Sequence, residues 1–111
     1  MNDEKCMNQI IEFSEKFYKN LDFAHNIGHG KRVLKNARKI AEKEGGNLFL
    51  IEAGSWLHQF HDNIDEVNNF IKTLDIEKEL KNKLYEIVKC RPQYINEESL
   101  LESKIVYDAD E

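Results

Sequence analysis

The segment that most constrains the fold is residues 48–60, LFLIEAGSWLHQF, which is apolar at nearly every position and broken mainly by Glu52 and Ser55. A helix that is apolar on all its sides leaves no face for water, so other elements must surround it. The sequence therefore predicts a central helix enclosed by the rest of the chain. His58, close to its end, is expected to be carried inward.

The remaining segments carry apolar residues at three- and four-residue steps, the spacing of one buried helix face. Such stripes predict helices over residues 4–21, from His29 to Gly45-Gly46, over 63–74, from 76 until Pro92, and over 96–111. Candidate helix caps are Asn63 paired with Glu66, Asp75, and Asn96. Because no β-strand alternation persists, we expect an all-α fold, a single compact bundle of about six helices.

Composition supports one globular domain spanning all 111 residues, since 41% of them are hydrophobic and the chain has only one proline and five glycines. The net charge of −5 argues against binding to long nucleic acids, which requires a basic surface. Within this acidic chain one local series is basic. It forms either the solvated face of a helix or a contact for a small phosphorylated ligand, and its members are Lys31, Arg32, Lys35, Arg38 and Lys39.

The two cysteines, Cys6 and Cys90, lie far apart and form no metal-binding or disulfide spacing, so reduced thiols are expected. No signal peptide and no apolar run near the roughly 20 residues of a membrane span is present. We therefore expect a cytoplasmic protein that does not associate with a membrane.

All four histidines, His25, His29, His58 and His61, fall within residues 25–62. This clustering indicates a metal site, although buried histidines also complete hydrogen-bond networks without binding metal. His29 and His58 stand on separate helices that each bury one face, so their side chains are expected to converge. A metal ion needs further oxygen ligands, and the available acids are Asp62, Asp108 and Asp110.

Three segments resemble the HD superfamily of metal-dependent phosphohydrolases, which are all-helical enzymes named for a metal-binding His-Asp pair. They are LDFAHNIGHGKRVLKNARKIAEKEG, AGSWLHQF and ESKIVYDADE. The resemblance implies that His29 is the first metal histidine, His58 the histidine of the pair, and Asp110 the last metal aspartate. It also implies that His25 is an accompanying catalytic histidine and that Asp108 supports Asp110.

The chain departs from the family pattern at the paired aspartate, where it carries Gln59. Asp62 lies four residues beyond His58 and shares its face if the helix runs on, so it is a candidate to replace the missing carboxylate. The alternative is that Asp62 only caps the next helix. A second departure is Arg91, which stands where relatives often carry another histidine.

The resemblance implies a hydrolase that acts on a nucleotide or another small phosphate ester with a divalent ion: manganese, iron, zinc, nickel or magnesium. Its catalytic residues would be His25, Gln59 and Asp62, while Lys31 and Arg32 would hold substrate phosphates unless Arg32 pairs with Asp22 or Glu52. The alternative is a catalytically impaired HD-fold protein that binds a ligand or partner. Because family members usually continue past the last aspartate, we also expect exposed apolar surface and a homodimer.

Overall fold

The computed structural model describes residues 3–20, 27–90, 95 and 99–110, and the side chains of these except at 17–20, 27–30, 59, 61, 62 and 110. Within these residues the fold is all-α, without a strand, and the prediction of about six helices is confirmed. The elements are α1 (Asp3–Asn20), α2 (Ile27–Glu44), α3 (Leu48–Leu57), the 3-10 helix η1 (His58–Asn63), α4 (Ile64–Lys72), α5 (Lys78–Lys89) and α6 (Leu101–Asp110). No described helix is both long and apolar enough to cross a bilayer.

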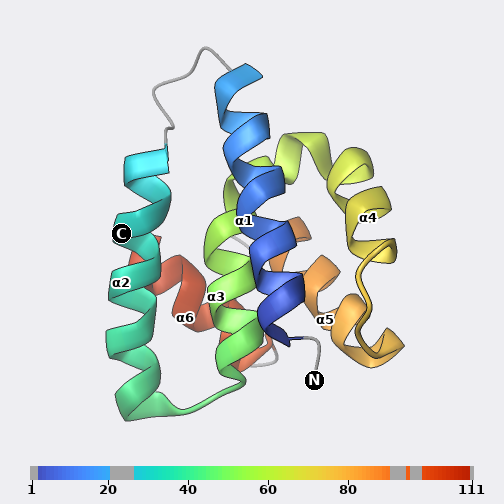
Figure 1. Ribbon diagram of the computed structural model, residues 1–111. Helices are drawn as coiled ribbons and strands as arrows, with labels where there is room; N and C mark the ends of the chain where they lie inside the picture. Colours follow the sequence, from blue (N-terminus) through green and yellow to red (C-terminus); the bar gives the residue numbers. More distant parts are fainter. Residues whose placement is uncertain (1–2, 21–26, 91–94, 96–98, 111) are drawn as a thin grey trace.

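Helix α3 is the centre of the bundle, as its sequence predicts (Figure 1). It contacts α1, α2, α5 and α6, and seven of its ten residues are buried. Leu57 and Ile51 are fully buried and Trp56 is 4% exposed. The other helices contribute one face each to the core, because their apolar residues repeat at helical spacing.

The α2–α3 turn forms where the glycine pair predicts it. Gly45 and Gly46 have φ angles of +83° and +97°, in the left-handed region that favours glycine. Asn47 then caps α3, because its side-chain oxygen accepts a hydrogen bond from the Leu50 amide at 3.1 Å. Glu102 of α6 accepts the Asn47 amide at 2.9 Å, so the last described helix closes this turn.

Several predicted helix boundaries differ from the structure. The α-helix of the central segment ends at Leu57 and continues as η1, in which Phe60 has non-helical angles of φ −96° and ψ 20°. Asn63 holds the N-cap position of α4 but makes no side-chain capping bond. Glu77, not Asp75, is the N-cap residue of α5. Helix α6 begins at Leu101, and the predicted cap Asn96 lies outside the described residues.

Gly54 allows α3 to approach α5 and α6 closely. A Cβ atom at this position would lie 2.7 Å from Ile87 Cγ2 and 3.3 Å from Val106 Cγ2. The Ile87 methyl is attached at a branched Cβ and cannot swing aside like the end of a flexible side chain. The absence of a side chain at Gly54 is therefore required by packing.

We expect Gly54→Ala to lower the free energy of unfolding by about 1–3 kcal/mol through overpacking, offset in part by the roughly 1 kcal/mol that alanine gains over glycine in a helix. Urea denaturation of both proteins measures the difference. In an Ile87→Ala background, where Cγ2 is absent, the same change at Gly54 should become neutral or stabilising. A Gly54→Ala protein that is simply more stable than the wild type would refute the close approach.

Candidate metal centre

His58 is buried at the junction of α3 and η1, with 2% of its surface exposed. Its backbone amide donates to the Gly54 carbonyl, so the residue completes the last turn of α3. Its ring Nδ1 lies 2.8 Å from the Ser55 carbonyl oxygen. A carbonyl only accepts, so Nδ1 carries the proton and Nε2 carries the lone pair in the neutral ring.

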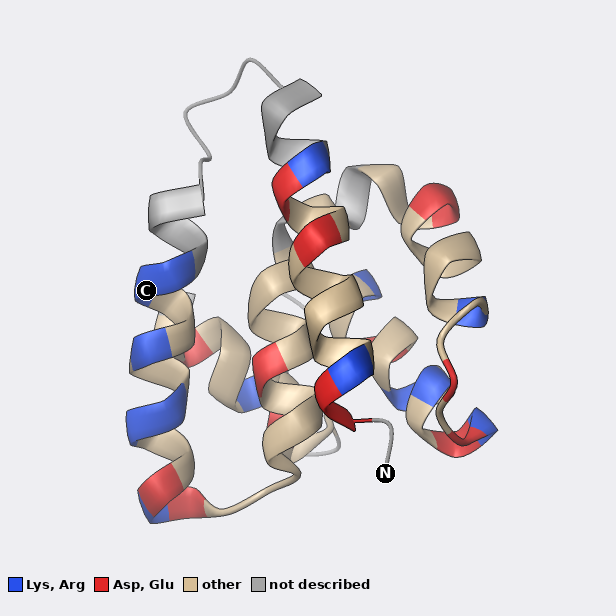
Figure 2. Cartoon of the chain, viewed as in Figure 1, with Lys and Arg blue, Asp and Glu red and all other residues tan. Residues whose placement is uncertain are grey.

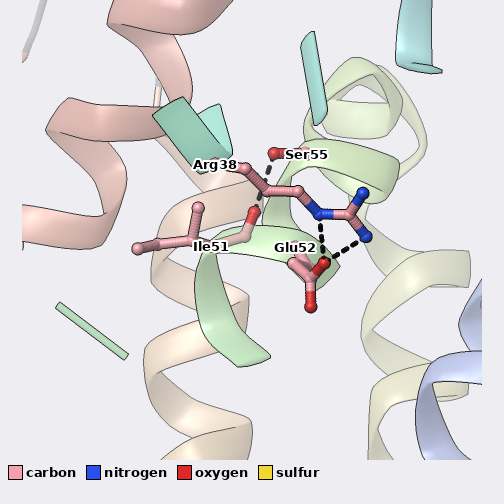
Figure 3. A network of polar contacts seen from close by, with 4 residues as sticks. All are labelled: Arg38, Ile51, Glu52 and Ser55. Atoms are coloured by element: carbon pink, nitrogen blue, oxygen red, sulfur yellow. Dashed lines mark hydrogen bonds and ion pairs between the residues drawn. The ribbon is translucent and has the colours of Figure 1, made fainter. Parts of the chain in front are cut away.

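This tautomer is the one that a metal ligand needs, because ligating histidines commonly donate their other ring N–H to a carbonyl or carboxylate. Ser55 helps to provide the carbonyl. Its own hydroxyl donates to the Ile51 carbonyl at 2.7 Å and stays within the helix (Figure 3). Sequence reasoning treated Ser55 only as a break in an apolar segment. The signal that was missed is its position three residues before His58, where its carbonyl is within reach of that ring.

Tyr107 of α6 fixes the ring from another side. The two ring centroids lie 5.8 Å apart, and the Tyr107 and His58 planes meet at 88° in an edge contact. The Tyr107 hydroxyl shares its proton between the carbonyls of Ile87, at 3.0 Å, and Cys90. Since these carbonyls belong to the last turn of α5 and to its C-cap residue, Tyr107 ties α6 both to α5 and to the histidine. No pattern in the sequence indicated this role for Tyr107.

The three helices that carry the expected ligands, α2, α3 and α6, contact one another. Asp110 follows Tyr107 by three residues, about one turn along α6. The Asn36 side-chain amide of α2 donates to the Ala109 carbonyl at 3.4 Å, so α2 packs beside this end of α6. His29 is the third residue of α2, two turns before Asn36. The start of α2 and the end of α3 lie at the same end of the bundle (Figure 1).

The side chains of His29 and Asp110 lie outside the described set, as do His25 and Arg91 entirely. The predicted approach of the His29 and His58 rings therefore stays a prediction. Among the described residues no group of three or more His, Cys, Asp or Glu side chains is arranged to hold a metal ion. Asp108, the expected supporting residue of Asp110, is exposed and makes no ion pair with a described residue.

Gln59, His61 and Asp62 all lie within η1, which changes the register assumed for Asp62. Positions four apart share a face only in an α-helix, whereas a 3-10 helix has three residues per turn. The condition under which Asp62 would share the face of His58 is therefore not met. The capping alternative for Asp62 also loses its basis, because Asn63 occupies the N-cap position of α4.

The basic series on α2 is exposed throughout, as expected for a solvated helix face. Glu52 of α3 pairs with Arg38, whose Nε donates to Glu52 Oε2 at 2.6 Å and whose Nη2 contacts the same oxygen (Figure 3). The alternative in which Arg32 pairs with Glu52 is therefore not realised. Lys31 and Arg32 make no ion pair with a described residue, which leaves both cations accessible to an anionic ligand.

Comparison with known proteins finds no matching family model and no matching curated protein. Two solved structures are similar to this chain. One is Bacillus subtilis YpgQ in complex with ADP, which is 27% identical with a TM-score of 0.80 over 99% of this chain and 58% of that one. The other is the Lin1889 protein from Listeria innocua, which is 30% identical with a TM-score of 0.77 over 99% of this chain and 56% of that one. The chain thus spans less than two thirds of the length of either protein.

Proposed function

We propose that this chain is a metal-dependent phosphohydrolase acting on a nucleotide or another small phosphate ester. The observation that carries the proposal is its similarity, over nearly its whole length, to a protein that binds ADP. The resemblance of its histidine motifs to the HD superfamily supports the same reaction class. The arrangement of His58 is compatible with it, since a buried imidazole with its proton on Nδ1 presents Nε2 as a ligand.

In this proposal His29, His58 and Asp110 would hold the metal ion, two imidazoles and one carboxylate of a kind that divalent transition metals accept. A divalent ion held there would supply Lewis acidity towards water and the phosphate group. The protein keeps the His58 ring in one tautomer through the Ser55 carbonyl and in one orientation through Tyr107. Burial of His58 excludes bulk water from its side of the site.

Lys31 and Arg32 follow His29 on α2 and would attract the phosphates of the substrate. Both are exposed, and Arg38 rather than either of them neutralises Glu52. Guanidinium and ammonium groups that lack an internal partner bind phosphate without first breaking an ion pair. An acidic chain with a local basic series near the site would direct a small anion to it.

The test is turnover by the purified chain. Nucleoside mono-, di- and triphosphates and a generic aryl phosphate are incubated with manganese, magnesium or zinc, and released phosphate and pyrophosphate are measured. We expect metal-dependent hydrolysis of at least one of them, removed by a chelator and restored by adding the ion back. Absence of hydrolysis for every substrate and metal would overturn the proposal.

A second candidate is a ligand-binding protein with impaired catalysis, favoured by Gln59 in place of the family's aspartate. An amide binds a divalent cation more weakly than a carboxylate does, so metal occupancy would be low. We expect Gln59→Asp to raise manganese affinity, which calorimetric titration measures. The matched control is Gln9→Asp, at an exposed position of α1. Unchanged or lower affinity in Gln59→Asp would show that position 59 does not contribute to the site.

A further inference from the structure

A groove lies between the start of α1 and the start of α3. It has a volume of about 390 Å³ and combines the acids Asp3 and Glu4 with the apolar side chains of Met7, Leu48 and Phe49, while Glu52 forms part of its wall. We name this the acidic groove. Leu48 is 53% exposed, more than any other large apolar side chain among the described residues. The groove therefore offers apolar area bordered by negative charge.

The outer side of α2 has the opposite character. Residues 27–44 hold six of the chain's 16 lysines and arginines but only two of its 21 acids. Lys31, Lys35 and Lys39 follow one another at four-residue steps and are exposed, and Arg38 lies on the same side. We name these four residues the basic face of α2. Figure 2 shows its cations repeated along the helix.

Of the four cations of the basic face, only Arg38 forms an ion pair with a described residue. Lys31, Lys35 and Lys39 make no ion pair with a described residue, and like charges at i and i+4 repel one another in a helix. On other helices, Lys16 and Lys83 do pair with an acid one turn away, Glu12 and Glu79 respectively. A negatively charged surface placed against α2 would remove this repulsion.

The two surfaces share a border. Arg38 belongs to the basic face and Glu52 to the wall of the acidic groove, and these two residues pair with each other between α2 and α3 (Figure 3). When two complementary surfaces adjoin on one molecule, a two-fold axis through their border places each surface of one copy against the complementary surface of the other. The same contact is then made twice. Such an arrangement is a closed dimer, because neither copy keeps an uncovered surface to which a third copy could bind.

We propose that the occupant of the acidic groove is the part of the basic face formed by Lys35, Arg38 and Lys39 of a second copy of this chain, with a two-fold axis close to the Arg38–Glu52 pair. Leu48, Met7 and Phe49 supply the apolar part of the contact, and Asp3 and Glu4 meet Lys35 and Lys39. The overall charge of −5 opposes association at a distance, so the attraction acts at contact, where the local charges are opposite. This inference does not depend on the proposed function.

Sedimentation equilibrium of the whole chain tests it. We expect the mass of two chains at about 50 mM salt. At about 1 M salt, where the screening length falls to about 3 Å, the average mass should fall towards that of a single chain. The variants Lys35→Glu/Lys39→Glu and Asp3→Lys/Glu4→Lys should each be monomeric. Mixed together they should form a one-to-one dimer, because both contacts of the two-fold interface then pair opposite charges again.

The matched control is Lys72→Glu/Lys78→Glu, the same change of charge at exposed positions on α4 and α5, which should leave the dimer intact. Circular dichroism confirms that each variant is folded. A wild-type chain that stays monomeric at low salt would overturn the proposal. So would a dimer that survives both charge reversals, or two variants that fail to associate when mixed.

Discussion

Replacing His58 by glutamine is expected to lower manganese affinity by at least about 100-fold, because even residues that only support a ligating histidine contribute about 10–100-fold. Glutamine keeps most of the side-chain volume and a hydrogen-bonding end, so the buried position stays filled. Hydrolysis should fall with metal affinity if the proposed function holds. Metal affinity is measured by calorimetric titration and turnover by phosphate release.

The matched control is His61→Gln, the same substitution three residues further along η1. It should leave metal affinity close to that of the wild type, since His61 is not one of the three expected ligands. Urea denaturation of both variants separates loss of a ligand from loss of structure. A folded His58→Gln protein with unchanged metal affinity would mean that His58 only completes a buried hydrogen-bond network.

The second large effect is expected at Tyr107, which is 5% exposed and joins α6 to α5 and to His58. Tyr107→Ala should lower the free energy of unfolding by about 3–5 kcal/mol, the range for removing a large buried aromatic side chain. That is a large share of the roughly 5–15 kcal/mol that stabilises a typical domain. Chemical denaturation followed by circular dichroism measures it.

Tyr107→Phe separates the two roles of this residue. Without the hydroxyl, the carbonyls of Ile87 and Cys90 lose a donor, which should cost about 1–3 kcal/mol of stability. The ring edge against His58 remains, so metal affinity should hardly change. Tyr85→Phe is the control, because Tyr85 is only partly buried and its loss of a hydroxyl should stay within about 0.5 kcal/mol. Equal stability of Tyr107→Phe and the wild type would contradict the role assigned to the hydroxyl.

Most helices of this fold could be predicted because a helix that is buried on one face carries apolar residues at helical spacing. Val33 and Ala37 on α2, and Leu84 and Ile87 on α5, recur at helical spacing and are buried as predicted. The end of α2 was equally predictable, since paired glycines are the residues best able to adopt two successive positive φ angles. These features depend on local sequence alone.

The change from α3 to η1 at His58 could not be predicted in the same way. Leu57 and Phe60 are three residues apart and both buried, a spacing that suits an α-helix and a 3-10 helix equally well. Phe60 is held by its surroundings, for its ring meets Phe13 of α1 edge-on at 6.2 Å. Because this contact joins segments far apart in the chain, local periodicity contains no sign of it.

In the candidate site, too, local sequence predicted some features, whereas others depend on how the helices pack. The inward position of His58 followed from the apolar segment around it, and burial confirms it. The supporting roles of Ser55 and Tyr107 depend on how carbonyls and rings meet after the helices pack, so residue type alone did not reveal them. The shared face considered for Asp62 required one α-helix to continue past His58, and this condition is not met because α3 ends at Leu57.

The surroundings of His58 are complete only while α6 is docked on the other helices. Asn36 bonds to Ala109 across 73 residues of sequence, Asn47 to Glu102 across 55, and the Tyr107 hydroxyl to the end of α5. Because α6 follows α1 to α5 in the chain, its residues are synthesised after theirs, and the wall beside His58 is the last of these parts to be made. In the folded protein, partial opening of this ten-residue helix would release all three contacts together. Hydrogen exchange at the last turn of α3 should then follow the opening of α6, so that the stability of one short helix sets how often the His58 ring loses its support.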